Sequence, residues 1–304
     1  MEYKEQYTRY VDMVEKTLEK LLPQTDEECP ADGGVIPKYL CESMRYSLLA
    51  GGKRIRPVLL LAVCDMLGGD MEQAAVHAAA LEMIHTYSLI HDDLPGMDDD
   101  DYRRGKLTNH KVYGVGHAIL AGDGLLNYAY ECMLQNALEH EENTVGLLKA
   151  ASAIAGCAGV SGMIAGQSLD LLSEHMAPEK DRLQYIHSHK TAYLLTAPLM
   201  AAAHICGAGE DELAALAGFG AHVGLAFQID DDLLDVQGDT ALLGKQTGMD
   251  EQRGKMTWPA LVGVEAARER SSQLWDGALA LIAPFGEKAW FLRSFALNLR
   301  DRKN

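Results

Sequence analysis

The chain has 304 residues, with 27 Lys and Arg against 44 Asp and Glu, and a formal net charge of −17. This acidity argues against nucleic acid as a partner, because phosphate backbones require a basic surface. The length suits one large helical domain, and no linker or internal repeat divides the sequence. We therefore predict a single domain over residues 1–304.

The N-terminus and the cysteines indicate the compartment. Residues 1–6 are charged and lack an apolar core, so no signal peptide is expected. The six cysteines are widely spaced without a CxxC pair, as is typical of reduced thiols. Two uncharged stretches, 150–169 and 191–209, are rich in Ala, Gly, Ser and Thr, which indicates packed interior helices rather than membrane spans. We predict a cytoplasmic protein without a membrane span.

Hydrophobic periodicity predicts ten helices and no strand of useful length. The fold class is therefore all-α, and we expect a helical bundle around a central cavity. In chain order, the helices are expected at about residues 3–22, 35–49, 55–67, 71–92, 112–139, 144–173, 179–206, 211–234, 257–283 and 287–301.

A basic turn, Gly51–Pro57, precedes the third expected helix and contains Lys53, Arg54 and Arg56. A helix start offers free N–H groups and the positive end of the helix dipole, and Pro57 suits the first turn. The turn is suited to an anion. The alternative is an ordinary solvated basic loop, and the turn alone does not decide between them.

The first acidic cluster, Asp92, Asp93 and Asp98, lies where a long apolar helix ends. A helix break separates Asp92 from Asp98, so the loop can fold the later acid back toward the first. So many carboxylates at one helix end need a counter-ion, and Mg²⁺ is the simplest candidate. His85 lies seven residues before Asp92 and on the same helical face. It is either a packed core histidine or a phosphate contact.

The second acidic cluster is Asp231, Asp232 and Asp235. The spacing of four places Asp231 and Asp235 on one helical face. Upstream, Lys190 and Thr191 precede an uncharged helix and could hold a diphosphate.

Six motifs occur in a fixed order between about Tyr39 and Ala266: GGKRIRP, HTYSLIHDDLPGMDDDDYRRG, GQSLDL, HKT, FQIDDDLLDVQGDT and GKMTWP. The ordered set resembles the bacterial short-chain trans-prenyl diphosphate synthases, closest to farnesyl diphosphate synthase. The resemblance implies an isoprenoid synthase bundle with a deep cavity, and a homodimer. It also implies head-to-tail condensation of isopentenyl diphosphate with dimethylallyl and geranyl diphosphates. Three Mg²⁺ ions per active site, with Mn²⁺ possible, would assist ionisation.

The resemblance assigns roles to residues of this chain. The metal ligands would be Asp92, Asp93, Asp98, Asp231, Asp232 and Asp235, and the catalytic set would be these acids except Asp235, together with Lys190. Isopentenyl diphosphate would be bound by Lys53, Arg56, His85 and Arg104. The allylic diphosphate would be bound by Arg103, Lys190, Thr191, Gln228, Lys245 and Lys255, supported by Gln167 and Asp170, and chain length would be set by Tyr87 and Ser88.

The sequence departs from the family pattern at two positions, and it does not decide what either departure does. Asp230 adds an acid to the second cluster and could alter metal affinity, and Tyr193 stands where a smaller residue is usual and could narrow the cavity. Geranylgeranyl or geranyl diphosphate synthesis, or a non-catalytic subunit of a heteromeric synthase, are the alternative functions. A class I terpene cyclase lacks support, because its second metal motif is absent from the sequence. A di-iron bundle would need two Glu-x-x-His pairs, and only the Glu82–His85 pair occurs.

Overall fold

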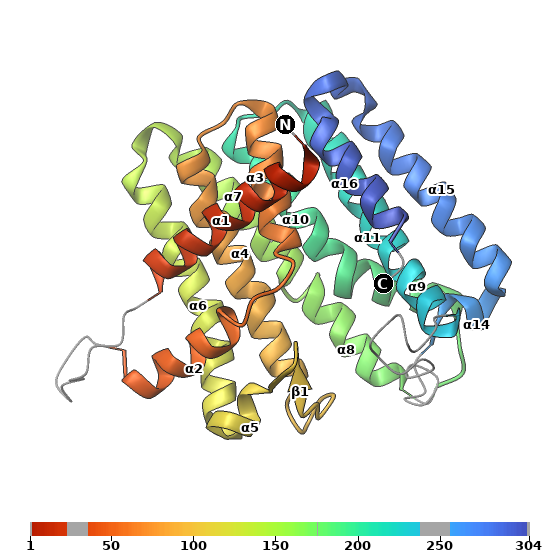
Figure 1. The fold of residues 1–304 in the computed structure, drawn as a ribbon, viewed down its shortest axis with the longest axis horizontal. Helices are drawn as coiled ribbons and strands as arrows, with labels where there is room; N and C mark the ends of the chain where they lie inside the picture. The colour runs from red at the N-terminus through yellow and green to blue at the C-terminus, as the bar shows by residue number, and fades with distance from the viewer. Residues whose placement is uncertain (1, 23–35, 175, 238–255, 303–304) are drawn as a thin grey trace. The chain divides into compact units, whose positions relative to one another are not determined.

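The computed structural model describes residues 2–22, 36–174, 176–237 and 256–302. Almost all regular structure in these ranges is helical, so the all-α prediction is confirmed (Figure 1). Packing divides the chain into two compact units. The first comprises Met1–Leu61 and Asp70–Ala151, and the second comprises Ala62–Gly69 and Ser152–Asn304. The single-domain assignment stays a prediction, and each unit is described by itself.

The first unit is centred on α4 (Met71–Asp92), which packs against α6 (Val115–Glu139) and α1 (Tyr3–Leu21) (Figure 1). Asp70 caps α4 by accepting hydrogen bonds from the backbone N–H groups of Glu72 and Gln73, at 2.8 and 3.1 Å. The remaining elements of the unit are α2 (Lys38–Leu48), the first part of α3 (Ile55–Leu67), α5 (Asn109–Tyr113), η1 (Glu141–Asn143) and the first part of α7 (Thr144–Ala158).

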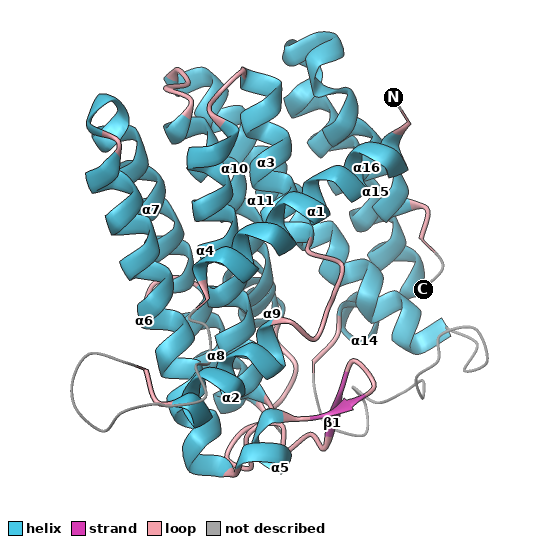
Figure 2. Cartoon of the chain, turned by 60° about the vertical axis from the view of Figure 1, so that its left-hand side comes forward, coloured by secondary structure: helices cyan, strands magenta, loops and turns pink. Residues whose placement is uncertain are grey.

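A small hairpin follows α4 in the first unit (Figure 2). Its antiparallel strands are β1 (Tyr102–Arg103) and β2 (Lys106–Leu107). Arg104 has φ 52° and Gly105 has φ 75°, and two successive left-handed residues suit a tight hairpin turn. Strands of two residues leave no alternating pattern in the sequence, so the hairpin was not predicted.

The second unit is centred on α11 (Glu210–Gln237), which packs against α10 (Tyr193–Ile205) and α15 (Val264–Ile282). A Cβ at Gly224 of α11 would lie 2.4 Å from the Cα of Ala192, so glycine is needed for this close approach. The other elements are α8 (Met163–Ser173), α9 (Lys180–Ile186), the π-helical turn η2 (His187–Ala192), α14 (Trp258–Val262), η3 (Ala283–Ala289) and α16 (Trp290–Arg300).

Three of the expected helices are interrupted, which corrects their predicted bounds. Gly114 (φ 82°) divides 112–139, and Gly263 (φ 85°) divides 257–283, because both glycines adopt the left-handed region that a helix cannot contain. The expected helix 144–173 breaks at residues 159–162, between α7 and α8. Hydrophobic periodicity continues across these breaks, so it could not locate them.

Two helical stretches, Glu141–Ser173 and Glu210–Val236, are long and apolar enough to cross a membrane by length and composition alone. Core helices of soluble proteins meet the same criterion. The first overlaps residues 150–169, one of the two uncharged stretches predicted to be interior helices, whereas the second lies beyond the other, 191–209.

Candidate functional site

The three basic side chains of the Gly51–Pro57 turn differ in how far they are buried. Lys53 is exposed, Arg56 is half-buried, and Arg54 is buried with only 2% of its surface exposed. Gly51 (φ 81°), Gly52 (φ 142°) and Arg54 (φ 49°) all have positive φ. The turn is therefore a specific backbone structure that presents Lys53 and Arg56, rather than an ordinary solvated loop.

Arg56 and His85 are in contact, with 3.2 Å between Arg56 Nη1 and His85 Nε2. Since a guanidinium only donates, His85 Nε2 accepts, and the imidazole is neutral. Burial holds the pKa of His85 well below its usual value, and the charges of Arg56 and Arg104 lower it further. Burial also lowers the pKa of Arg56, to about 10, and its Nε–H has no hydrogen-bond partner among the described residues. A donor buried without a partner suits an anionic ligand.

Arg104 reaches the same turn from the hairpin. Its guanidinium donates to the carbonyl oxygen of Gly51. Gly52 has a φ of 142°, which residues with a side chain rarely adopt, and a Cβ there would lie 2.7 Å from Arg104 Cζ. The first unit therefore brings together the four residues predicted to bind isopentenyl diphosphate: Lys53, Arg56, His85 and Arg104.

The first acidic cluster folds back on itself as predicted. The backbone N–H of Asp98 donates to the carbonyl oxygen of Asp92 at 2.8 Å. Asp92 and Asp98 are both half-buried at this bend. The loop thus holds two of the three predicted metal ligands at one place.

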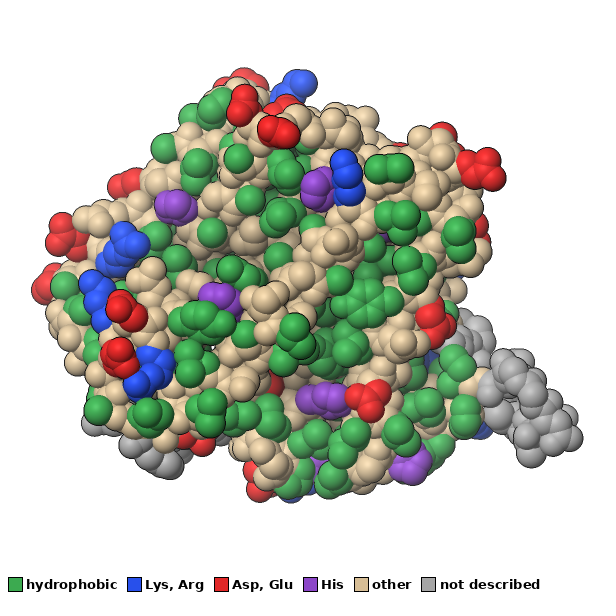
Figure 3. All heavy atoms as spheres, turned by 180° about the vertical axis from the view of Figure 1, so that it is seen from behind, with side chains coloured by type: hydrophobic (Ala, Val, Ile, Leu, Met, Phe, Trp, Pro, Cys, Tyr) green, Lys and Arg blue, Asp and Glu red, His purple; other side chains and the backbone are tan. Residues whose placement is uncertain are grey.

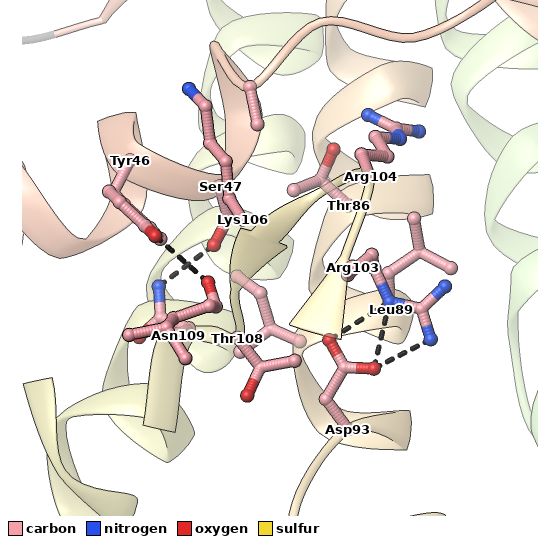
Figure 4. Close-up of a pocket in the computed structure, with 13 residues that line it drawn as sticks. Tyr46, Ser47, Thr86, Leu89, Asp93, Arg103, Arg104, Lys106, Thr108 and Asn109 are labelled. Atoms are coloured by element: carbon pink, nitrogen blue, oxygen red, sulfur yellow. Dashed lines mark hydrogen bonds and ion pairs between the residues drawn. The ribbon is translucent and has the colours of Figure 1, made fainter. Parts of the chain in front are cut away.

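Asp93 differs from its two partners, because it is 3% exposed and bound to Arg103 (Figure 4). Arg103 Nε lies 2.8 and 2.9 Å from the two carboxylate oxygens, and Nη2 lies 2.6 Å from Oδ1. Burial raises the pKa of Asp93, and the hydrogen bond from Arg103 opposes that effect. The structure pairs a predicted metal ligand with a predicted allylic-diphosphate ligand, in a pocket that Thr86 and Arg104 also line.

In the second cluster, Asp232 is the buried acid, at 4% exposure. Its Oδ2 accepts the backbone N–H of Trp258 at 2.9 Å and lies 3.8 Å from His187 Nε2. The indole Nε1–H of Trp258 donates to His187 Nδ1 at 3.1 Å. Burial lowers the pKa of His187 to about 3, so this imidazole is neutral.

Asp230 and Asp231 point to different partners. Asp230 accepts Ser271 Oγ at 2.5 Å and the indole N–H of Trp275 at 2.8 Å, so α15 engages both of its carboxylate oxygens. Asp231 accepts Arg302 Nη2 at 2.5 Å, and the Arg302 guanidinium stacks 3.9 Å above the ring of Phe227. The additional acid of this motif is thus a packing residue against α15.

Lys190 and Thr191 lie in the π-helical turn η2, which re-aims side chains within a helix. Lys190 Nζ lies 2.6 Å from Asp170 Oδ2, and Thr191 Oγ1 donates to Gln228 Oε1 at 2.9 Å. A Cβ at Gly166 would lie 2.2 Å from the Lys190 backbone nitrogen, so glycine permits α8 to approach η2. The second unit therefore groups the predicted allylic-site residues Lys190, Thr191, Gln228 and Asp170.

The two predicted chain-length residues lie on α4. Tyr87 is 6% exposed, and its ring meets that of His91 edge-on with centroids 5.7 Å apart. Burial raises the pKa of Tyr87 to about 12. Ser88 is half-buried and donates to the His85 carbonyl at 2.9 Å. Tyr193, the second departure, is 37% exposed and packs on His189 with centroids 4.4 Å apart.

Two predicted cations, Lys245 and Lys255, lie outside the described residues. The two acidic clusters belong to different units. Within the described ranges, no three His, Cys, Asp or Glu side chains group as a metal site. The half-buried Asp92 and Asp98 at one bend nevertheless fit Mg²⁺, which takes one or two carboxylates and fills its other positions with water and phosphate oxygens.

Several residues that shape these sites were given no role in them from the sequence. Arg54 is tied to Glu15 and Glu82 in the first unit, and Trp258 and His187 hold Asp232 in the second. A carboxylate such as Glu82 within an all-round apolar helix requires a cation partner, and that signal was available. Nothing in the spacing indicates that Trp258 contacts Asp232.

Comparisons with known proteins agree on one family. The model of the family described as Polyprenyl synthetase matches residues 37–280. A dimethylallyltranstransferase of Fischerella ambigua is 48% identical over 86% of this chain and 75% of its own length. A geranylgeranyl diphosphate synthase of Cyanophora paradoxa is 42% identical over 96% of this chain and 94% of its own length. The crystal structure of an FPP/GFPP synthase from Zymomonas mobilis superposes with a TM-score of 0.83 at 34% identity, covering 97% of this chain and 98% of that one.

Proposed function

Because this chain belongs to the polyprenyl synthetase family and is a prenyltransferase, we propose that it condenses isopentenyl diphosphate with dimethylallyl and geranyl diphosphates to give farnesyl diphosphate. Its relatives carry names that differ in the product, dimethylallyltranstransferase and geranylgeranyl diphosphate synthase among them. Family membership therefore leaves the chain length of the product open. The observation that favours farnesyl diphosphate is the buried ring of Tyr87 near the end of α4.

Isopentenyl diphosphate is assigned to the basic turn of the first unit. Lys53 supplies an exposed point charge, whereas Arg56 and Arg104 supply planar guanidinium forks that can hold phosphate oxygens in pairs. His85 is neutral and accepts from Arg56, so it orients that guanidinium rather than adding a positive charge. This headgroup site is needed because a protein of net charge −17 repels a diphosphate at long range.

The allylic diphosphate is assigned to Lys190, Thr191 and Gln228, with Lys245, Lys255 and the two acidic motifs. Bound Mg²⁺, three ions per site by family resemblance, would supply Lewis-acid stabilisation of the leaving diphosphate. Asp92, Asp98, Asp231 and Asp235 would hold these ions. Asp93 and Asp232 are buried and bound by protein donors, which favours a supporting role for both in holding their neighbours.

The proposed reaction breaks the C1–O bond of the allylic substrate and releases diphosphate with the bonding electron pair. The isopentenyl double bond attacks C1, and the resulting cation loses a proton to the departing diphosphate. The products are a prenyl diphosphate five carbons longer and inorganic diphosphate. Lys190 neutralises charge as it develops on the leaving group, and an apolar cavity keeps water from the cation.

Tyr87 is proposed as the floor of the cavity. It lies five residues before Asp92, so at about 1.5 Å rise per residue its ring sits roughly 7.5 Å along α4 from the acid. Tyr87→Ala should shift the product from C15 to C20 or longer, and Ser88→Phe should shift it toward C10. Chromatography of the dephosphorylated products measures both shifts. Unchanged C15 in both variants would place the floor elsewhere, and C20 from the wild type would make the protein a geranylgeranyl diphosphate synthase.

We also propose that the protein is a homodimer, that each subunit is a single domain, and that it is located in the cytoplasm. Several large apolar side chains of α6 and α7 are exposed, and Figure 3 shows one face rich in hydrophobic side chains with few charges among them. The exposed set on these helices is Val115, Ile119, Leu120, Leu134, Leu138, Val145 and Leu148. Light scattering of Leu138→Glu should give monomers where the wild type gives dimers, and a monomeric wild type would contradict this part of the proposal.

A further inference from the structure

Arg54 is the one cation of the Gly51–Pro57 turn that received no role in substrate binding. Its guanidinium donates Nε to Glu15 Oε1 at 2.7 Å, Nη1 to Glu82 Oε1 at 2.8 Å and Nη2 to the Leu48 carbonyl at 2.7 Å. The acceptors belong to α1, α4 and the end of α2. One side chain therefore joins three helices of the first unit to the turn.

The backbone at Arg54 shows that this anchorage shapes the turn. A φ of 49° is unfavourable for a residue with a side chain and persists only where the surroundings hold it. The Arg54 carbonyl accepts the N–H of Val58 at 3.1 Å, so the same residue opens α3. Lys53 precedes Arg54 and Arg56 follows two positions later, so the direction of both depends on the conformation at Arg54.

Helix α1 supports the turn through a second contact. The Tyr7 hydroxyl donates to the Lys53 carbonyl at 2.5 Å, and burial raises the pKa of Tyr7, which keeps the phenol protonated. α1 packs against α4 (Figure 1) and precedes residues 37–280, the segment that the family model matches. The contacts of Glu15 and Tyr7 are therefore features of this chain that the family match does not cover.

We propose that Arg54 and Glu15, together with the buried Glu82, position the turn that binds the isopentenyl diphosphate headgroup, so that α1 sets the affinity for this substrate without touching it. The inference rests on the proposed assignment of Lys53 and Arg56 to that headgroup. Arg54 is a positioning residue, because each of its three nitrogens donates to a protein acceptor. The Glu82 carboxylate also counteracts the effect of burial on the pKa of Arg56, which keeps that guanidinium charged.

Glu15→Ala is the informative variant, since the Glu15 side chain is 36% exposed and its removal leaves little unfilled space. The KM for isopentenyl diphosphate should rise roughly 3- to 10-fold, while kcat and the KM for geranyl diphosphate stay within about 2-fold. Calorimetry with isopentenyl diphosphate alone, which does not react, should show the same loss of affinity. Glu5→Ala, an exposed acid on the same helix, is the matched control and should change none of these values.

Two further variants separate the inference from the function on which it rests. Arg54→Lys keeps the charge but cannot reach three acceptors, so it should reproduce the selective rise in KM. Lys53→Ala tests the headgroup site itself: unchanged affinity for isopentenyl diphosphate in Lys53→Ala would show the site assignment to be wrong. If Lys53→Ala weakens binding but Glu15→Ala and Arg54→Lys do not, the positioning inference is overturned. A parallel change in kcat and both KM values would also overturn it, by showing a general loss of structure.

Discussion

The two acidic motifs share a pair of adjacent aspartates but hold it in different ways. The first pair lies at the end of α4, where the following loop closes back through the Asp98 N–H, whereas the second lies on the continuous helix α11. In both, the second aspartate of the pair is buried and held by protein donors: Asp93 by the guanidinium of Arg103, and Asp232 by the backbone N–H of Trp258. The repeated arrangement indicates that one acid of each pair has a structural, anchoring role, while the other is left to a different role.

The position of the nearby arginine distinguishes the motifs. In the first motif, Arg103 binds the anchoring acid Asp93. In the second motif, Arg302 binds Asp231, the acid proposed to hold metal. A cation on a proposed metal ligand competes with Mg²⁺, whereas a cation on the anchoring acid does not. Arg302 should therefore weaken Mg²⁺ binding at the second motif, whereas Arg103 should not do so at the first.

The largest expected effect comes from the acids proposed as metal ligands. Asp92→Ala and Asp231→Ala should each lower the single-turnover rate by at least about 10²- to 10³-fold, the usual cost of losing one well-placed electrostatic group. Chelation with EDTA should abolish the wild-type rate, and added Mg²⁺ should restore it. Asp230→Asn is the matched control for Asp231: because α15 engages Asp230, its rate should stay within a few-fold while its melting temperature falls. Near-normal rates in Asp92→Ala and Asp231→Ala would rule out their role as metal ligands.

A buried histidine of the first unit should make the protein sensitive to acid. Burial lowers the pKa of His77 to about 4 from 6.5, and its Nε2–H donates to the Leu147 carbonyl at 3.1 Å. Below pH 6.5 the unfolded chain takes up this proton before the folded protein does. The stabilisation is therefore complete above pH 6.5 and is lost progressively as pH falls to about 4, by roughly 3 kcal/mol.

Urea unfolding between pH 7.5 and 4.5 measures this loss. His77→Gln should flatten the decline in the free energy of unfolding over that range, even if its stability at pH 7.5 is lower. His117→Gln, at an exposed position, is the control and should keep the wild-type slope. An identical slope in His77→Gln would assign the acid sensitivity to other groups.

The smallest effect tests the difference between the motifs directly. Arg302→Ala removes the cation that lies 2.5 Å from Asp231, and the half-saturating Mg²⁺ concentration should fall by about 2- to 5-fold, since a partly exposed ion pair contributes up to about 1 kcal/mol. Arg300→Ala, which removes an exposed pair with Asp276, is the matched control. Equal Mg²⁺ dependence in both variants and the wild type would show that Arg302 does not compete with metal.

The sequence by itself determined the helical class and the family resemblance. An apolar helix over residues 71–92 was predicted with the bounds that the structure shows, because the run contains no glycine or proline, is too long for a strand and is followed by Pro95 and Gly96. The fold-back of Asp98 toward Asp92 followed from a helix break within a six-residue spacing. The family resemblance that the motifs carried was confirmed by the match over residues 37–280.

Only the tertiary structure decided which polar groups engage one another. Arg54 and Arg56 are two residues apart in one basic turn, yet one is buried against carboxylates from α1 and α4 and the other contacts His85. Asp230 and Asp231 are adjacent, yet they bind side chains 41 and 71 positions further along the chain. Local spacing specifies which residues share a helical face, but the partner across a helix–helix contact depends on packing between distant segments. That packing is set by the whole hydrophobic core, and no single motif encodes it.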